Sequence, residues 1–369
     1  MIALVLRLIF ILPFVMLKHI QPRYRVHPRY SWHQATFIVV VRWYLEYQAR
    51  SRPVTPQPLG PQPGFPNDIT IHPSAEKMYL SPLDDGEIRP TSVRATWYPR
   101  PPPPPPPPDS TTSTTSNNRS KVILHFHGGA YVVGSSHPTD CDFMAKKLIQ
   151  HHVAPHALFL DYRLSCTPQG RFPAALQDAV SAYVHLLGLG YSSDDVIVSG
   201  DSAGGHLAIG FLRYLSCYPI LNLPEPRIVL LWSPWIDVST GYDDPTRITR
   251  MQNFKTDYIP VSFITWGAHA LVPENSHMVD VKSPYISFLG NRFATKSRVW
   301  VHAGALELLY PEIVEFVDQM AEVEGNEISL CVSPYANHDI LETGHLNGFG
   351  AEVDRILKVV RAIAQDEMS

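Results

Sequence analysis

The segment from Val196 to Gly205 constrains the fold of this chain more than any other. A β-branched apolar run leads into Gly-Asp-Ser-Ala-Gly, and a helical pattern follows. A strand that turns sharply into a helix needs small residues where its backbone is squeezed, and Gly200 and Gly204 stand two positions to either side of Ser202. Such a turn exposes the Ser202 hydroxyl, and the helix start leaves N–H groups free to face negative charge. The pattern therefore predicts a nucleophilic serine between a strand and a helix.

A second glycine turn lies upstream. Residues 121–126 read as a buried strand that runs into His127, Gly128 and Gly129. Adjacent glycines let backbone N–H groups point into a cavity without a side chain in the way. We therefore predict that the N–H groups of Gly128, Gly129 and Ala203 receive the negative charge that develops on a reacting carbonyl oxygen.

These motifs resemble those of α/β hydrolases in the hormone-sensitive lipase-like esterase family. Further matching motifs follow in the family's order and extend the resemblance over about residues 90 to 365: Asp161-Tyr-Arg-Leu164, Phe172-Pro-Ala-Ala175, Ser233-Pro-Trp235 and Ser283-Pro-Tyr285. The chain also resembles fungal steryl acetyl hydrolases and arylacetamide deacetylases. The resemblance implies hydrolysis of small lipophilic esters through an acyl-enzyme, acetyl esters of sterols or secondary metabolites in particular. It implies no metal and no organic cofactor.

The general base should lie well after Ser202, because the partners in this fold follow in the order serine, acid, histidine. Residues 327–333 alternate like a late strand, and His338 lies in the loop after them. We predict His338 as the base that takes the Ser202 proton. His345, further along the same stretch, is the alternative.

The acid should lie between the serine and the histidine. Glu307 comes just after a strand-like segment, residues 297–304, and glutamate is a known variant of this partner. We predict Glu307 as the carboxylate that orients the base. Asp237, at the end of an earlier strand, is the alternative, and its ordinary role would be to cap a turn.

Strand and helix patterns alternate along residues 91–369, the predicted catalytic domain. Strand patterns fall near 92–98, 121–126, 156–161, 195–199, 227–232, 298–303 and 327–333, and helical patterns near 138–151, 173–187, 203–216, 311–323 and 350–364. This alternation predicts an α/β-hydrolase fold, with a mainly parallel central sheet, helices on both faces and a helical cap. The aromatic-rich residues 240–280 are a candidate lid. Residues 100–120, an octaproline followed by a Ser/Thr tract, predict a disordered insertion.

The apolar sequence at the N-terminus predicts contact with a membrane. Residues 1–20 are a candidate anchor, although a full span needs about 20 apolar residues and Arg7 interrupts the run. Residues 21–90 are predicted to form a cap or linker, with an amphipathic helix near 37–47. We predict association with the endoplasmic reticulum membrane, with a cytoplasmic location as the alternative.

Composition restricts the other functions. The formal net charge of −4 gives no reason to expect nucleic-acid binding, and the four scattered cysteines do not have zinc-ligand spacing. Two alternatives to an esterase stay open. One is an amidase of the arylformamidase type, and the other is a catalytically inactive hydrolase-fold binding module. The presence of Ser202, Glu307 and His338 together favours an enzyme.

Overall fold

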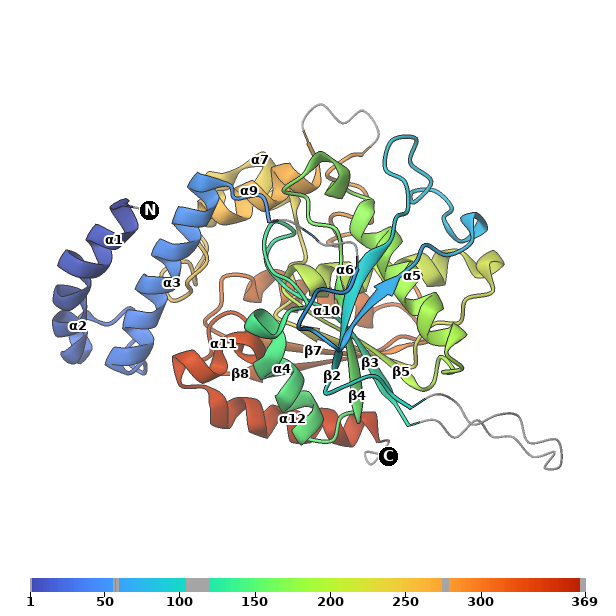
Figure 1. Ribbon diagram of the computed structural model, residues 1–369. Coiled ribbons are helices and arrows are strands. Elements are labelled where there is room, and N and C mark those ends of the chain that lie inside the picture. The colour runs from blue at the N-terminus through green and yellow to red at the C-terminus, as the bar shows by residue number, and fades with distance from the viewer. Residues whose placement is uncertain (1, 56, 58–59, 104–119, 274–278, 366–369) are drawn as a thin grey trace.

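The computed structural model describes residues 2–55, 57, 60–103, 120–273 and 279–365. At its centre lies an eight-stranded sheet in the order β1-β2-β4-β3-β5-β6-β7-β8 (Figure 1). The strands are β1 (Asp68–Ile71), β2 (Val93–Tyr98), β3 (Val122–Phe126), β4 (His156–Asp161), β5 (Val196–Asp201), β6 (Ile228–Trp232), β7 (Arg298–Gly304) and β8 (Glu327–Ser333). The strand β2 runs antiparallel to both of its neighbours, and all the other pairs are parallel. The predicted mainly parallel sheet is confirmed.

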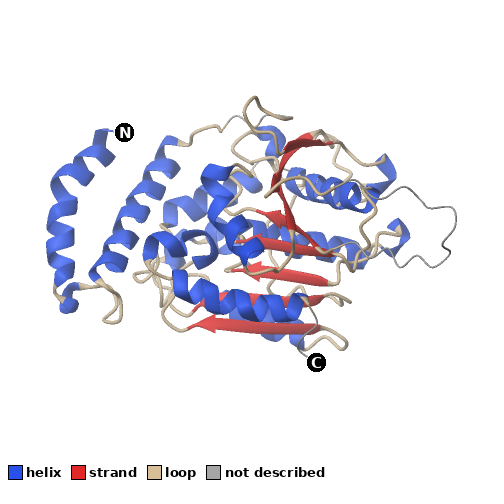
Figure 2. Ribbon diagram, turned by 60° about the horizontal axis from the view of Figure 1, so that its bottom comes forward, coloured by secondary structure: helices blue, strands red, loops and turns tan. Residues whose placement is uncertain are grey.

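Helices cover both faces of this sheet, as Figure 2 shows. They are α4 (Pro138–Gln150), α5 (Ala174–Gly188), α6 (Ala203–Cys217), α10 (Tyr310–Ala321), α11 (Ile340–Asn347) and α12 (Gly350–Ala364). Successive strand side chains point to opposite faces, so Ile123 joins the core under α4 and α12, whereas Leu124 joins the core under α5, α6 and α10. Both side chains are fully buried. Each such burial contributes about 1.5–3 kcal/mol, and this favours apolar side chains at the buried positions of the strands.

The N-terminus forms a helical hairpin beside the sheet domain (Figure 1). Its first arm consists of α1 (Ile2–Leu6), a π-helical turn η1 (Arg7–Ile11) and α2 (Leu12–Ile20), and its second arm is α3 (Trp32–Ser51). A capping box between Ser31 and Gln34 starts α3. Across the hairpin, Arg7 Nη1 lies 2.9 Å from Glu46 Oε2. Within the described part of the chain, no helix combines the length and apolar character needed to span a bilayer.

The helical cap consists of α3 together with three helices between β6 and β7, namely α7 (Ser239–Asp243), α8 (Pro245–Ile248) and α9 (Val261–Leu271). The helix α3 packs against α9, and α9 packs against α7 and α8. The three helices lie in the predicted lid segment 240–280. The cap therefore combines two segments that are about 200 residues apart in the sequence.

The remaining regular structure is short. The helical turns are η2 (Pro22–Tyr24), η3 (Glu76–Met78), η4 (Pro168–Gly170) and η5 (Pro219–Leu221). The sequence patterns did not predict the four-residue β1, nor α11, which follows the loop that holds His338. Most of the predicted insertion, residues 104–119, lies outside the described residues.

Candidate active site

Ser202 lies on a tight turn between β5 and α6. Its backbone φ is +50°, a value that residues other than glycine rarely adopt. The surrounding glycines are required by close packing. A Cβ on Gly200 would lie 2.2 Å from the carbonyl oxygen of Gly204, and a Cβ on Gly204 would lie 1.9 Å from that of Phe126. The turn is held by hydrogen bonds from the Ser202 N–H to Trp232 and from the Trp235 N–H to Ser202, both 2.9 Å long. The strained backbone thus keeps the Ser202 hydroxyl at the end of the sheet.

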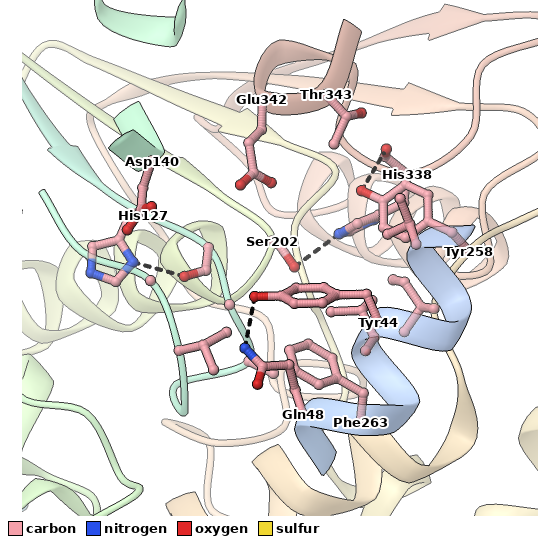
Figure 3. Close-up of a pocket in the computed structure, with 18 of the residues that line it drawn as sticks. Tyr44, Gln48, His127, Asp140, Ser202, Tyr258, Phe263, His338, Glu342 and Thr343 are labelled. Atoms are coloured by element: carbon pink, nitrogen blue, oxygen red, sulfur yellow. Dashed lines mark hydrogen bonds between the residues drawn. The ribbon is translucent and has the colours of Figure 1, made fainter. Parts of the chain in front are cut away.

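The structure brings Ser202, His338 and Glu307 together. His338 Nε2 lies 2.9 Å from Ser202 Oγ, which is hydrogen-bonding distance (Figure 3). On the other side of the ring, His338 Nδ1 lies 3.3 Å from Glu307 Oε2. The Glu307 side chain is fully buried and that of His338 is nearly so. A serine, an imidazole and a carboxylate in this order are the parts needed for nucleophilic acyl transfer.

Asp257 is a second buried carboxylate at this site, and the sequence patterns did not identify it. Its Oδ1 accepts hydrogen bonds from the N–H groups of Tyr258 at 2.7 Å and His338 at 3.2 Å. Its Oδ2 accepts from the N–H of Leu308 at 2.6 Å, directly after Glu307. One side chain therefore fastens the loop of the histidine to the loop of the glutamate. No periodic pattern surrounds Asp257, so only its long-range contacts reveal this role.

Burial dominates the electrostatics of the three groups. It lowers the pKa of His338 from its ordinary value, while the negative charges of Asp257 and Asp339 raise it. Burial also raises the pKa of Glu307 to about 8, against hydrogen bonds from Ser233 and the backbone that favour the charged form. A positive charge on His338 would stabilise the Glu307 carboxylate, because each group then supplies the counter-charge of the other. The pair is thus suited to carry an imidazolium transiently.

The glycine loop after β3 lies directly against the nucleophile. A Cβ on Gly128 would lie 3.3 Å from the Cβ of Ser202, and Gly129 has a φ of +106°. Gly128, Gly129 and Ser202 line the same cavity, while Ala203 is the buried first residue of α6. His127 stacks on the ring of Tyr162 at 4.3 Å, and its Nδ1 lies 2.7 Å from the Gly128 carbonyl oxygen. His127 therefore supports the loop.

The two alternative residues have other surroundings. The ring of His345 packs on Phe143, with 4.2 Å between the ring centroids, at the edge of the cavity. Asp237 caps the start of α7, where its Oδ1 accepts hydrogen bonds from the N–H of Ser239 at 2.9 Å and from the Ser239 hydroxyl at 2.6 Å. The contacts described for the Asp237 carboxylate do not include His338. The geometry favours His338 and Glu307 over both alternatives.

A cavity of about 560 Å³ opens in front of Ser202. One wall is apolar and is formed by the helical cap, with Phe37, Val41, Tyr44 and Leu45 from α3 and Phe263 and Ile264 from α9. The other wall carries polar groups from the glycine loop, α4 and α11 (Figure 3). A cavity of this size and lining is typical of sites for small organic molecules.

Residues 123–342 match the family described by the alpha/beta hydrolase fold. The chain is 36% identical over 131 residues to an acetyl-hydrolase of Streptomyces hygroscopicus. This alignment covers 35% of this chain and 41% of that protein. It is 29% identical over 254 residues to an ethyl acetate hydrolase of Pseudomonas putida. That alignment covers 66% of this chain and 72% of the relative. The chain thus spans less than half the length of the Streptomyces relative.

Solved structures of esterases and lipases are also similar to this chain. An esterase/lipase from an uncultured bacterium matches with a TM-score of 0.55 and 29% identity over 67% of this chain and 76% of that one. A hormone-sensitive lipase from a metagenome library matches with a TM-score of 0.55 and 25% identity over 67% and 78%. The chain therefore belongs to the alpha/beta hydrolase family, and its structure is similar to those of esterases that include a hormone-sensitive lipase.

Proposed function

We propose that this protein hydrolyses carboxylic esters, with Ser202 as nucleophile, His338 as general base and Glu307 as the acid that orients the base. The observation that carries the proposal is the 2.9 Å contact between His338 Nε2 and Ser202 Oγ. His338 takes the hydroxyl proton while Ser202 attacks the ester carbonyl carbon. Glu307 holds the ring and stabilises the imidazolium that forms.

The negative charge on the carbonyl oxygen is received by the N–H groups of Gly128, Gly129 and Ala203 in this proposal. Each such donor contributes about 10²–10³ in rate. His338 then gives its proton to the leaving alcohol, and an acyl group stays on Ser202. Water, activated by the same imidazole, attacks the acyl carbon and releases the carboxylic acid.

We propose small lipophilic esters as substrates, acetyl esters in particular. The apolar wall of the cavity supports the lipophilic part, and the names of two relatives, an acetyl-hydrolase and an ethyl acetate hydrolase, support the short acyl group. The narrower resemblance to fungal steryl acetyl hydrolases stays a prediction, and so does a sterol or secondary metabolite as the alcohol.

A series of p-nitrophenyl esters from acetate to decanoate tests this substrate class. We expect kcat/KM to be highest at the shortest chains and to fall by about 10-fold or more toward decanoate. The reason is that a long acyl chain must share a cavity of about 560 Å³ with the alcohol. A steep optimum at long chains would contradict the choice of acetyl esters, and hydrolysis of formanilide in preference to every ester would favour the amidase.

We also propose that the N-terminal hairpin rests on a membrane surface. Phe10, Phe14 and Leu17 have more than 60% of their surface exposed. Exposed basic residues, including Lys18 and Arg23, follow this apolar face. An apolar face beside basic residues is typical of helices that lie on anionic bilayers. The endoplasmic reticulum as the site of this contact stays a prediction.

Flotation with vesicles that contain anionic lipid tests this contact. We expect the protein to float with the vesicles and the double variant F14S/L17S to stay in the dense fraction, because burial of two large apolar side chains is lost. The double variant should keep its activity on p-nitrophenyl acetate, which shows that it is folded. Equal behaviour of the two proteins would reject the proposed contact.

A further inference from the structure

The cavity in front of Ser202 has an acidic wall, by which we mean Asp140 on α4 and Glu342 on α11. Both residues line the cavity, and the Glu342 carboxylate points into the space beside Ser202 (Figure 3). The Asp140 carboxylate is held in place by Ser135, whose hydroxyl donates a hydrogen bond of 2.6 Å to its Oδ2. The proposed reaction uses neither carboxylate. The position of Glu342 beside Ser202 therefore calls for another explanation.

Two buried carboxyl groups lie behind Glu342. Oxygen atoms of Asp201, Asp339 and Glu342 lie within 4.8 Å of one another. Asp201 and Asp339 are at most 1% exposed, and their carboxyl groups form a hydrogen bond with each other, so the pair shares a proton. Burial raises the pKa of Asp201 to about 8 and that of Asp339 well above its ordinary value. Burial disfavours the charged form of these groups, and a positive charge nearby would stabilise that form.

The protein itself supplies little positive charge at this place. Asp201 Oδ1 lies 2.9 Å from His125 Nε2, but burial lowers the pKa of His125 to about 3, so that ring is neutral. Among the described residues that line the cavity there is no lysine and no arginine. Its titratable rings are those of His127, His338 and His345 and of Tyr44 and Tyr258. The residue Glu342 as a whole is exposed, but desolvation of its carboxyl group, then the negative charges of Asp339 and Asp140, raise its pKa to about 8. The field at the acidic wall is therefore negative above pH 8, where Glu342 is ionised.

Aromatic rings lie across the cavity from this wall. Tyr44 of α3 and Phe263 of α9 lie on the far side of Ser202 from Glu342 (Figure 3). Faces of aromatic rings attract ammonium groups, most strongly where water is excluded. A small organic cation in the cavity would thus meet carboxylates on one side and rings on the other.

We propose that the acidic wall is a subsite for an ammonium group of the substrate, so that the enzyme prefers esters whose alcohol carries a positive charge. Glu342 is the specificity-determining residue of this subsite, and Asp140 assists it. The inference rests on the proposed ester hydrolysis and narrows its substrate class. Anionic esters are disfavoured by the same field, because they would place a like charge beside Glu342 and Asp140.

Two esters of equal shape test the subsite. Acetylcholine and neohexyl acetate differ in one atom, which is a charged nitrogen in the first and an uncharged carbon in the second. Both are assayed above pH 8, because Glu342 ionises at a pKa of about 8. We expect kcat/KM to favour acetylcholine by about 10-fold or more in the unaltered protein. In Glu342→Gln this preference should fall close to one, because the carboxylate that attracts the ammonium group is lost.

The matched control is Glu324→Gln, an exposed carboxylate in the turn before β8. Because β5 and β8 run in the same direction, this turn lies at the opposite end of the strands from Ser202. It should keep the preference for acetylcholine. Equal rates on the two esters in the unaltered protein, or an unchanged preference in Glu342→Gln, would overturn the subsite while leaving ester hydrolysis intact. Hydrolysis of neither ester, together with no activity on p-nitrophenyl acetate, would instead reject the proposed function.

A metal ion is the other cation that three carboxyl groups could attract. Tetramethylammonium and calcium chloride are therefore compared as inhibitors of neohexyl acetate hydrolysis. We expect competitive inhibition by tetramethylammonium that is lost in Glu342→Gln. Inhibition by calcium alone would assign the cluster to a metal and overturn the ammonium subsite.

Discussion

Replacing Ser202 by alanine is expected to lower kcat for p-nitrophenyl acetate by about 10⁶-fold, because the attacking oxygen is removed and water must replace it. The residual rate would come from binding and from the N–H groups of the glycine loop. The measurement is steady-state hydrolysis by purified protein, with labelling by a fluorophosphonate probe in parallel. The unaltered protein should be labelled and Ser202→Ala should not.

The folded state of Ser202→Ala is checked by its thermal unfolding midpoint. We expect little change, since Ser202 Oγ is described with one partner, His338 Nε2. Persistent labelling of the variant would show that another residue is the nucleophile. If the unaltered protein is not labelled at all, the chain is a catalytically inactive member of its family and serves as a binding module.

Replacing Glu307 by glutamine is expected to lower kcat by about 10⁴-fold. The amide keeps the shape of the side chain but cannot stabilise the imidazolium, and it favours the wrong tautomer of His338. The distance of 3.3 Å between His338 Nδ1 and Glu307 Oε2 supports this choice. The measurement is again kcat, which isolates the chemical step better than KM does.

Asp237→Asn is the matched control for this prediction. Its carboxylate lies at the start of α7 and bonds to Ser239, so the variant should keep most of its activity. If Asp237→Asn lost activity on the scale expected for Glu307→Gln, and Glu307→Gln did not, the acid would have been assigned to the wrong strand end. The two variants together decide between the two candidates that the sequence left open.

Local backbone chemistry explains which parts of the fold could be predicted. The turn around Ser202 needs glycine at 200 and 204 for reasons that act within five residues, so the sequence pattern alone reveals it. The central strands β3, β5 and β6 consist mostly of apolar residues, and this pattern is also visible in the sequence. The predicted strands from 121–126 to 327–333 therefore lie close to the observed ones.

The parts that could not be predicted depend on contacts between distant segments. Asp257 lies between α8 and α9, and its partners are backbone groups at positions 308 and 338. Glu307 and Asp237 both follow strands, so only distances in the folded chain separate them. The contribution of α3 to the cavity likewise required its packing against α9, because an apolar helix pattern fits a membrane helix and a cap equally well.

Arg42 on α3 connects the N-terminal hairpin to the segment that supports the active site. Its guanidinium donates hydrogen bonds to the carbonyl oxygens of Phe254 and Asp257. The Asp257 side chain in turn accepts a hydrogen bond from the backbone N–H of His338. The helix α3, which forms part of the apolar wall of the cavity, is therefore linked through Asp257 to the loop that holds the imidazole of His338. The shape of the apolar wall and the alignment of the proton acceptor thus depend on the same helix.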